Sequence, residues 1–326
     1  MLEKEVDERT DVSQPWEEDN QAWWDWYVSL ADNTRNATEL EPAPSMPETE
    51  IPSDADVFAE LARPYPVTEQ QRISFRSNGF IKLRQVFSPG VILRLRAELV
   101  RLLKAEFEVD PDTGASDRFL SLEMTWLDNP LVRAYVLSPR LAQISADLLG
   151  VNAVRLYHDN VLAKQPGCGR TPWHFDDHHF PLDTDNVVTA WMPAQAISNA
   201  MGPLAFAYPL DVHRLVDAVT FEKSGVGYDR GVADVFAKNH VAVDDTPFEV
   251  GDVSFHHNLS FHTAASNHSD RSRIVLANTY YEDGVRIIDS PTMVSGDWQK
   301  FLPGVKPAEV AASPLNPICW PVDADT

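Results

Sequence analysis

The sequence predicts a mainly β protein with flanking helices, built as an antiparallel sandwich or barrel. After Gly150, short apolar or alternating runs recur between turn residues at 153–163, 187–192, 204–207, 253–257 and 274–281. Strands at such intervals, without long helices between them, are typical of antiparallel sheets. Before Gly150 the apolar residues follow a helical period instead, so helices are expected to precede the sheets.

Capping residues mark the helices of the first half. Thr68, with Gln71 three residues later, has the pattern of a capping box, and the pair Asn78-Gly79 is a typical helix end. A strand is expected directly afterwards, at 80–83. Ser-Pro pairs suit the first turn of a helix, and they begin two further helices at 88 and 138.

An acidic segment precedes this folded body. The 326-residue chain carries a net charge of −22, and residues 1–60 hold 17 acidic against three basic residues, which gives −14 for that segment. We expect an acidic Trp/Pro-rich extension and linker at 1–66 and one folded domain at 67–326. The aromatic residues at 16–27 predict a short helix that docks on the body or on a second subunit, which would make a homo-oligomer; the alternative is a mobile acidic tail.

The composition excludes several classes of protein. With 44% apolar residues the chain can bury a sizeable core, yet no apolar run approaches the roughly 20 residues of a membrane helix. The negative charge argues against nucleic acid and anionic membranes as partners. The acidic start lacks the pattern of a signal peptide, and Cys168 and Cys319 form no disulfide framework, so a reducing, cytoplasmic location is expected.

The stretch 172–176 contains a metal-binding pattern. His174 and Asp176 are two residues apart in a predicted strand, so both side chains point to one face while Trp173 and Phe175 pack behind them. A His-X-Asp pair plus one distant histidine is the ligand set of the facial triad that binds non-haem Fe(II) and leaves coordination positions open.

The pattern itself leaves the third ligand open, because the histidines downstream are His213, His240, His256, His257, His262 and His268. A 2-oxoacid cosubstrate would need a fixed cation for its far carboxylate, and arginine supplies a bidentate fork for that purpose. The segment 262–273 begins with His262 and ends with Arg273, at the mouth of the predicted strand 274–281. Arg271 has the same strand parity and is the rival cation.

Together these segments resemble the phytanoyl-CoA dioxygenase family of Fe(II)/2-oxoglutarate-dependent oxygenases. The similarity runs with gaps from about 68 to 320, and its segments are, in order, Asn78-Gly79-Phe80, Lys164-Gln165-Pro166-Gly167, Trp173-His174-Phe175-Asp176, Thr189-Ala190-Trp191-Met192-Pro193, Met201-Gly202-Pro203-Leu204, Gly251-Asp252-Val253 and His262…Asn267…Arg273. No single segment is specific, but their order and spacing together are.

The resemblance implies a double-stranded β-helix core (a jelly roll of the cupin type) and a requirement for Fe(II) and for 2-oxoglutarate as cosubstrate. It selects His262 as the iron ligand beside His174 and Asp176, since the family's interval of eleven residues from the distal histidine to the oxoglutarate arginine leads from His262 to Arg273. It also places Trp191 in the cosubstrate pocket. One departure concerns Ala264, where the family often has a small hydroxylated residue, so cosubstrate binding is expected to depend more on Arg273.

The implied reaction is the oxidation of a small organic molecule by O2 with release of succinate and CO2. Related halogenases lack the carboxylate, so Asp176 favours hydroxylation, desaturation or rearrangement over chlorination. Two alternatives are an O2-independent jelly-roll isomerase or epimerase and a non-catalytic binding module. The segment 211–245, with Tyr228, Arg230 and Phe236, is expected to cover the pocket, and the acidic charge argues against a polyanionic acyl-CoA substrate.

Overall fold

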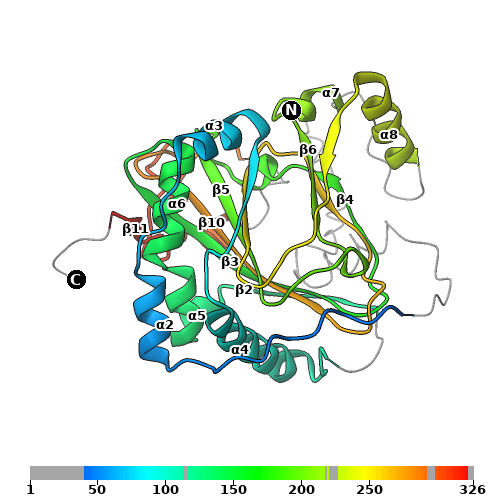
Figure 1. Cartoon of the computed structure of the whole chain (residues 1–326). Coiled ribbons are helices and arrows are strands. Elements are labelled where there is room, and N and C mark those ends of the chain that lie inside the picture. The colour runs from blue at the N-terminus through cyan, green and yellow to red at the C-terminus, as the bar shows by residue number, and fades with distance from the viewer. Residues whose placement is uncertain (1–39, 113–116, 217–218, 220–226, 292–297, 322–326) are drawn as a thin grey trace, which may run out of the picture.

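Two antiparallel sheets form the centre of the protein (Figure 1). The computed structural model describes residues 40–112, 117–216, 219, 227–291 and 298–321. The larger sheet contains β1 (Phe80–Leu83), β2 (Phe119–Glu123), β3 (Val154–Lys164), β5 (Val187–Pro193), β8 (Val253–His257), β10 (Arg273–Glu282) and β11 (Ile318–Trp320). The smaller sheet contains β4 (Thr171–His174), β6 (Leu204–Tyr208), β7 (Ala242–Asp244) and β9 (His262–Ala264). All five strand runs expected after Gly150 are confirmed.

The strand order shows the jelly-roll path. The larger sheet has the order β1-β8-β5-β10-β3-β11, with β2 also paired to β3, and the smaller sheet has the order β4-β9-β6-β7. Along the chain, β3, β5, β8 and β10 of the larger sheet alternate with β4, β6–β7 and β9 of the smaller one. Each crossing carries the chain from one sheet to the other, which is the winding of a double-stranded β-helix. The predicted fold class is therefore confirmed.

Helices cover the outer face of the larger sheet (Figure 1). The helices of the first half are α2 (Asp54–Leu61), α3 (Glu69–Asn78), α4 (Pro89–Phe107), α5 (Pro130–Val136) and α6 (Pro139–Leu149). Those of the second half are α7 (Val212–Val216), α8 (Gly227–Asn239) and α9 (Trp298–Phe301). The main apolar core lies between the first group and the sheet, where Leu95 and Ile144 of the helices and Phe255 and Leu276 of the strands are all fully buried. A second, smaller core lies between the two sheets and includes Trp191 and Phe206.

The capping residues act as the sequence predicts. The Thr68 hydroxyl accepts a hydrogen bond from the Gln71 amide (3.3 Å), and the Gln71 side chain accepts one from the Thr68 amide (2.8 Å). Gly79 ends α3 with φ +81°, a left-handed conformation that favours glycine. Strand β2 and helices α2, α5 and α8 were not predicted. Val57 and Leu61 of α2 belong to the main core, so this part of the segment 1–66 packs against the body.

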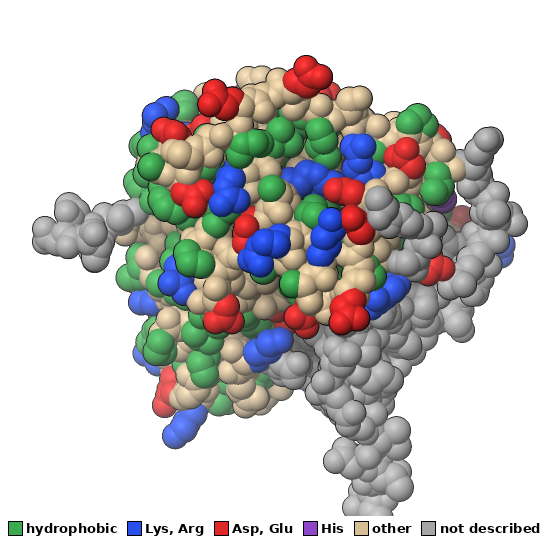
Figure 2. All heavy atoms as spheres, turned by 90° about the horizontal axis from the view of Figure 1, so that it is seen from below, with side chains coloured by type: hydrophobic (Ala, Val, Ile, Leu, Met, Phe, Trp, Pro, Cys, Tyr) green, Lys and Arg blue, Asp and Glu red, His purple; other side chains and the backbone are tan. Residues whose placement is uncertain are grey.

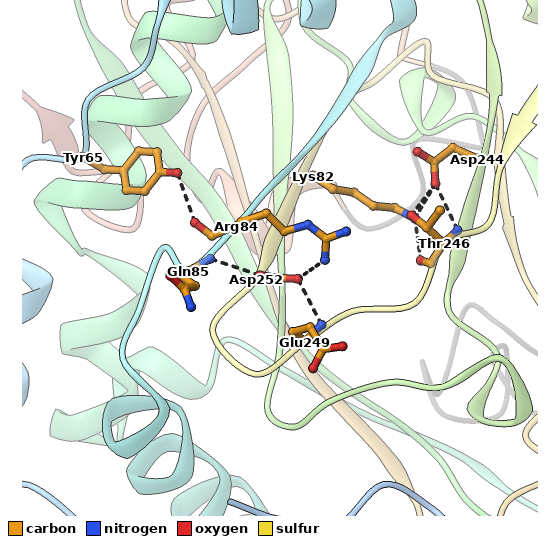
Figure 3. A network of polar contacts seen from close by, with 8 residues as sticks. All are labelled: Tyr65, Lys82, Arg84, Gln85, Asp244, Thr246, Glu249 and Asp252. Carbon is orange, nitrogen blue, oxygen red and sulfur yellow. Dashed lines mark hydrogen bonds and ion pairs between the residues drawn. The ribbon is translucent and has the colours of Figure 1, made fainter.

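A polar network joins the edges of the two sheets (Figure 3). Lys82 of β1, in the larger sheet, donates from Nζ to Asp244 of β7, in the smaller sheet, at 2.8 Å. The same ammonium group also donates to the carbonyl of Thr246 at 2.8 Å. Nearby, the buried Asp252 carboxylate accepts from the backbone amides of Gln85 and Glu249, both at 3.0 Å. The Lys82–Asp244 ion pair therefore links strands that share no backbone hydrogen bonds.

The described surface carries both signs of charge. In the face seen from below, basic and acidic side chains are interspersed (Figure 2). No helix among the described residues is both long and apolar enough to cross a membrane. Residues 1–39, which include the predicted aromatic helix, lie outside the described residues, so its docking and the homo-oligomer it would form stay predictions.

Candidate metal and cosubstrate site

Strand β4 presents two kinds of side chain to its two faces. Trp173 packs on the outer face, where its ring stacks on Phe261 with centroids 5.4 Å apart. Because successive strand residues alternate, His174 points the opposite way, into the space between the sheets. The pairing of β4 with β9 places His174 directly opposite His262, and the two ring centroids are 4.2 Å apart. The register of two short strands thus brings together histidines 88 positions apart in the sequence.

Asp176 completes a cluster of three metal-ligand side chains. Its Oδ1 lies 3.5 Å from Nε2 of His174 and 3.9 Å from Nε2 of His262. One ligand atom from each of the three residues lies within 4.8 Å of the other two. The backbone amide of Asp176 donates to the Asn258 carbonyl at 2.8 Å, which ties the residue to the loop after β8. The three residues that the sequence singled out therefore meet at one point.

The backbone sets the orientation of both imidazoles. Nδ1 of His174 lies 2.8 Å from the carbonyl of Pro172, and Nδ1 of His262 lies 2.9 Å from the carbonyl of Ser260. A carbonyl oxygen only accepts, so each Nδ1 carries the proton and each Nε2 keeps its lone pair. Both lone pairs belong to the nitrogen atoms that approach Asp176 Oδ1. This is the tautomer a metal ligand needs.

Burial fixes the protonation states. It lowers the pKa of His174 and of His262 to about 4, from an ordinary value of 6.5, despite the nearby carboxylate. Burial by itself would raise the pKa of Asp176, but the surrounding histidines more than offset it and hold the pKa well below its usual range. At neutral pH the cluster therefore offers two neutral imidazoles and one carboxylate. That donor set fits non-haem Fe(II).

Arg273 is a buried cation in the same inter-sheet space. It begins β10 and is 2% exposed, and its Nη1 donates to the carbonyl of Gly202 at 2.6 Å. Its guanidinium lies 5.4 Å from the ring of Trp191. Among the described residues no carboxylate pairs with it, and its buried Nε has no hydrogen-bond partner there. Burial lowers the pKa of Arg273 to about 10, so the group remains charged at neutral pH. A fixed, incompletely partnered guanidinium suits an anionic ligand.

Two of the rival residues, Arg271 and His257, are placed elsewhere. Arg271 donates from Nη1 to the carbonyl of Pro44 at 3.0 Å, ahead of the strand and away from the Trp191 ring. His257 faces Phe75 on the helix side of the larger sheet, with ring centroids 6.3 Å apart. His256, by contrast, does reach the cluster: its Nε2 lies 3.4 Å from Oδ2 of Asp176. The sequence held no signal for this contact beyond the position of His256 in a predicted strand, because the contact depends on how β8 is paired.

The expectation that Tyr228 and Phe236 of the segment 211–245 cover the pocket needs correction. Helix α8 lies on the outer side of β4, where Tyr228 donates to the carbonyl of Trp173 at 2.9 Å and Phe236 meets the Trp173 ring edge-on at 5.1 Å. These contacts are on the face opposite His174. Tyr228 and Phe236 therefore brace the metal strand from behind instead of covering the pocket, because the apolar side of β4 needs a packing partner.

A surface cavity of about 370 Å³ includes Asp177, the residue that follows Asp176 in the sequence. It is lined by residues of the loop 177–185 and by Ile288. Three of the lining side chains are carboxylates, those of Asp177, Asp183 and Asp185. Burial, and next the charge of Asp185, raise the pKa of Asp177 above its ordinary value. The lining of this cavity is therefore rich in carboxylates.

The sequence matches the family model described as "Phytanoyl-CoA dioxygenase (PhyH)" over residues 75–275. Among curated proteins, the peroxisomal phytanoyl-CoA dioxygenase of Mus musculus is 28% identical over 155 residues, 42% of this chain and 46% of the mouse protein. The Bos taurus protein of the same name is 24% identical over 242 residues, 68% of this chain and 70% of the bovine protein. The chain thus spans about half to two thirds of the curated relatives it matches.

Solved structures share the fold. The non-heme alpha ketoglutarate dependent carbocyclase SnoK from nogalamycin biosynthesis superposes with a TM-score of 0.61 at 22% identity, covering 78% of this chain and 99% of SnoK. EctD from S. alaskensis with bound Fe superposes with a TM-score of 0.57 at 18% identity, covering 86% of this chain and 98% of EctD. Since the family model spans more than half of the sequence, the chain belongs to the phytanoyl-CoA dioxygenase family of Fe(II)/2-oxoglutarate-dependent oxygenases.

Proposed function

We propose that the protein oxidises a small organic metabolite, with His174, Asp176 and His262 holding Fe(II) and Arg273 holding the far carboxylate of 2-oxoglutarate. The observation that carries the proposal is the proximity of three ligand atoms. Asp176 Oδ1 lies 3.5 Å from Nε2 of His174 and 3.9 Å from Nε2 of His262, and both nitrogens keep their lone pairs. Three protein ligands on one side leave the other positions of an octahedral metal to the cosubstrate and O2. When bound, the metal and 2-oxoglutarate supply an oxidant for C–H bonds and release succinate and CO2.

The buried arginine supports 2-oxoglutarate as the cosubstrate. Arg273 is charged, 2% exposed and without a carboxylate partner among the described residues. A buried charge of this kind is costly unless a ligand neutralises it, and a guanidinium pairs with a carboxylate through two parallel hydrogen bonds. Trp191 lies against the guanidinium and limits the space beside it. We assign Trp191 to the wall of the cosubstrate pocket.

Backbone groups position the ligands. The carbonyls of Pro172 and Ser260 hold the two imidazoles in the ligating tautomer. The Asp176 carboxylate occupies the place that a halide would need, so the chain is set up for hydroxylation, desaturation or rearrangement. A complete ligand set and a retained arginine also argue against a non-catalytic binding module, which would need neither.

The acidic cavity bears on the substrate. Asp177, the residue after Asp176, lines a cavity together with Asp183 and Asp185, and these carboxylates would repel a polyanionic CoA ester that bound there. We therefore propose a neutral or cationic small molecule as the substrate. The cytoplasmic location also stays a proposal, supported by two buried cysteines, Cys168 and Cys319, which form no disulfide and so suit a reducing compartment.

The test is anaerobic. Apo-protein is given Fe(II) and then 2-oxoglutarate, and the visible metal-to-ligand charge-transfer band of the chelate is followed in the wild type, His174→Ala and Arg273→Ala. We expect a band in the wild type, none in His174→Ala, and a band in Arg273→Ala only at much higher 2-oxoglutarate. Absence of the band in the metal-loaded wild type would refute the proposal. Substrate candidates are then screened by succinate release.

A further inference from the structure

The two oxygens of the Asp176 carboxylate have different surroundings. Oδ1 faces Nε2 of His174 and of His262, at 3.5 Å and 3.9 Å. Oδ2 faces Nε2 of His256 instead, at 3.4 Å. The carboxylate therefore has one oxygen on the side of the ligand nitrogens and one turned toward a fourth histidine.

His256 lies in a largely apolar wall and is 3% exposed. In the register of the larger sheet it lies opposite Phe80 of β1 and Thr189 of β5. Its ring centroid is 5.6 Å from that of Phe206 and 4.6 Å from that of His262. Its Nδ1 is buried and has no hydrogen-bond partner among the described residues. The polar contact of this imidazole in the described structure is therefore the one to Asp176.

The tautomers separate His256 from the two ligands. His174 and His262 carry their protons on Nδ1, where backbone carbonyls accept them, and keep the Nε2 lone pair. A carboxylate oxygen only accepts, so His256 must carry its proton on Nε2 to hydrogen-bond with Oδ2. A nitrogen that donates to Asp176 cannot at the same time ligate a metal. His256 is thus built to hold the carboxylate and not the ion.

We propose that His256 is a positioning residue that holds Oδ2 of Asp176 and so fixes this carboxylate as a one-oxygen ligand through Oδ1. The inference rests on the proposed function. With three protein ligands, two positions for 2-oxoglutarate and one for O2, an octahedral metal has no position left for a second carboxylate oxygen. Without the hydrogen bond, the carboxylate could rotate, so that Oδ1 would no longer be held beside the ligand nitrogens of His174 and His262.

Three variants test the role. His256→Phe removes the donor and matches the aromatic neighbours Phe80 and Phe206, whereas His256→Gln keeps an N–H donor on a side chain of similar reach. His257→Phe is the matched control, since His257 is the next residue of β8 and faces Phe75 on the other side of the sheet. For each variant the anaerobic Fe(II) dissociation constant and the 2-oxoglutarate charge-transfer band are measured, after circular dichroism has shown that the variant is folded.

We expect His256→Phe to weaken Fe(II) binding by about 10- to 100-fold, the usual effect of losing a residue that orients a metal ligand, and to shift or weaken the band. His256→Gln should stay close to the wild type, and His257→Phe should match it. Wild-type Fe(II) affinity and an unchanged band in folded His256→Phe would overturn the inference, as would an equal loss in His256→Gln. If His256→Phe does not fold, His256→Asn decides in its place, because its shorter amide cannot reach Oδ2 and the same loss is expected. A wild type without the band would instead refute the proposed function itself.

Discussion

Replacing Arg273 tests the cosubstrate pocket most directly. Its guanidinium is 2% exposed and uses one N–H bond on the Gly202 carbonyl, which leaves further donors for a carboxylate. Removing one partner of a buried, hydrogen-bonded charge pair costs about 2–5 kcal/mol, which corresponds to roughly 30- to 5,000-fold in a dissociation constant. We expect Arg273→Met to weaken 2-oxoglutarate binding by a factor in that range. Arg273→Lys keeps the charge but loses the fork, so its loss should be smaller, on the order of tenfold.

The assay is an anaerobic titration of 2-oxoglutarate into the Fe(II)-loaded protein, followed by the charge-transfer band. Arg271→Met is the control, because Arg271 is two residues away and bonds the Pro44 carbonyl. Its titration curve should overlay that of the wild type. A wild-type titration curve for Arg273→Met would refute the role of Arg273, as would a larger loss of affinity in Arg271→Met than in Arg273→Met.

Three further predictions concern stability. Burial lowers the pKa of His257 to about 4 from 6.5, so its contribution is fully present above pH 6.5 and is lost as the pH falls toward 4. In denaturant titrations of the apo-protein, the free energy of unfolding should fall between pH 7.5 and 5.5 by about 1.4 kcal/mol less in His257→Gln than in the wild type. An equal fall in both proteins would contradict the assignment. For the ion pair between sheets, Asp244→Ala should destabilise by about 2 kcal/mol, because the 6%-exposed Lys82 ammonium loses its carboxylate partner and keeps the Thr246 oxygens. Lys82→Met should cost about 1 kcal/mol or less. The reverse order in urea midpoints would count against this account. Gly202→Ala should lower the melting temperature strongly and weaken 2-oxoglutarate binding, since a Cβ there would lie 2.1 Å from the Ala265 carbonyl oxygen at φ +69°. A wild-type melting temperature for Gly202→Ala would contradict this prediction, because it would mean that the backbone at Ala265 moves aside without cost.

The features that the sequence could predict depend on residues close together in the chain. The capping box at Thr68 and the glycine at 79 act within a few residues, and the structure confirms both. The alternation of Trp173 and His174 needs only the strand geometry and is confirmed, but β4 ends at His174. Asp176 was expected in the same strand and instead lies just after it, with φ −90° and ψ −9°. The contact between His256 and Asp176 could not be predicted, because it requires β8 to lie between β1 and β5.

The selection of His262 and Arg273 shows the same limit. The residues alone left several histidines and Arg271 open, and the choice came from the spacing of a known family. Helix α8 was not predicted for a related reason. Its residues pack on Trp173, which lies 55 positions from Tyr228 in the sequence, so no local pattern indicates this packing partner. Long-range pairing decided each of these features.

The placement of α8 behind β4 has a consequence for how this enzyme can change. Segments that connect strands usually lie at the surface and tolerate insertions and deletions. Here the segment contains Tyr228 and Phe236, which pack on one face of β4, while His174 lies on the opposite face of the same strand. A shortened or redesigned version would expose an aromatic surface and loosen the register that sets His174 beside His262. Engineering for new substrates should therefore leave this helix intact and vary the loop 177–185, where the cavity opens.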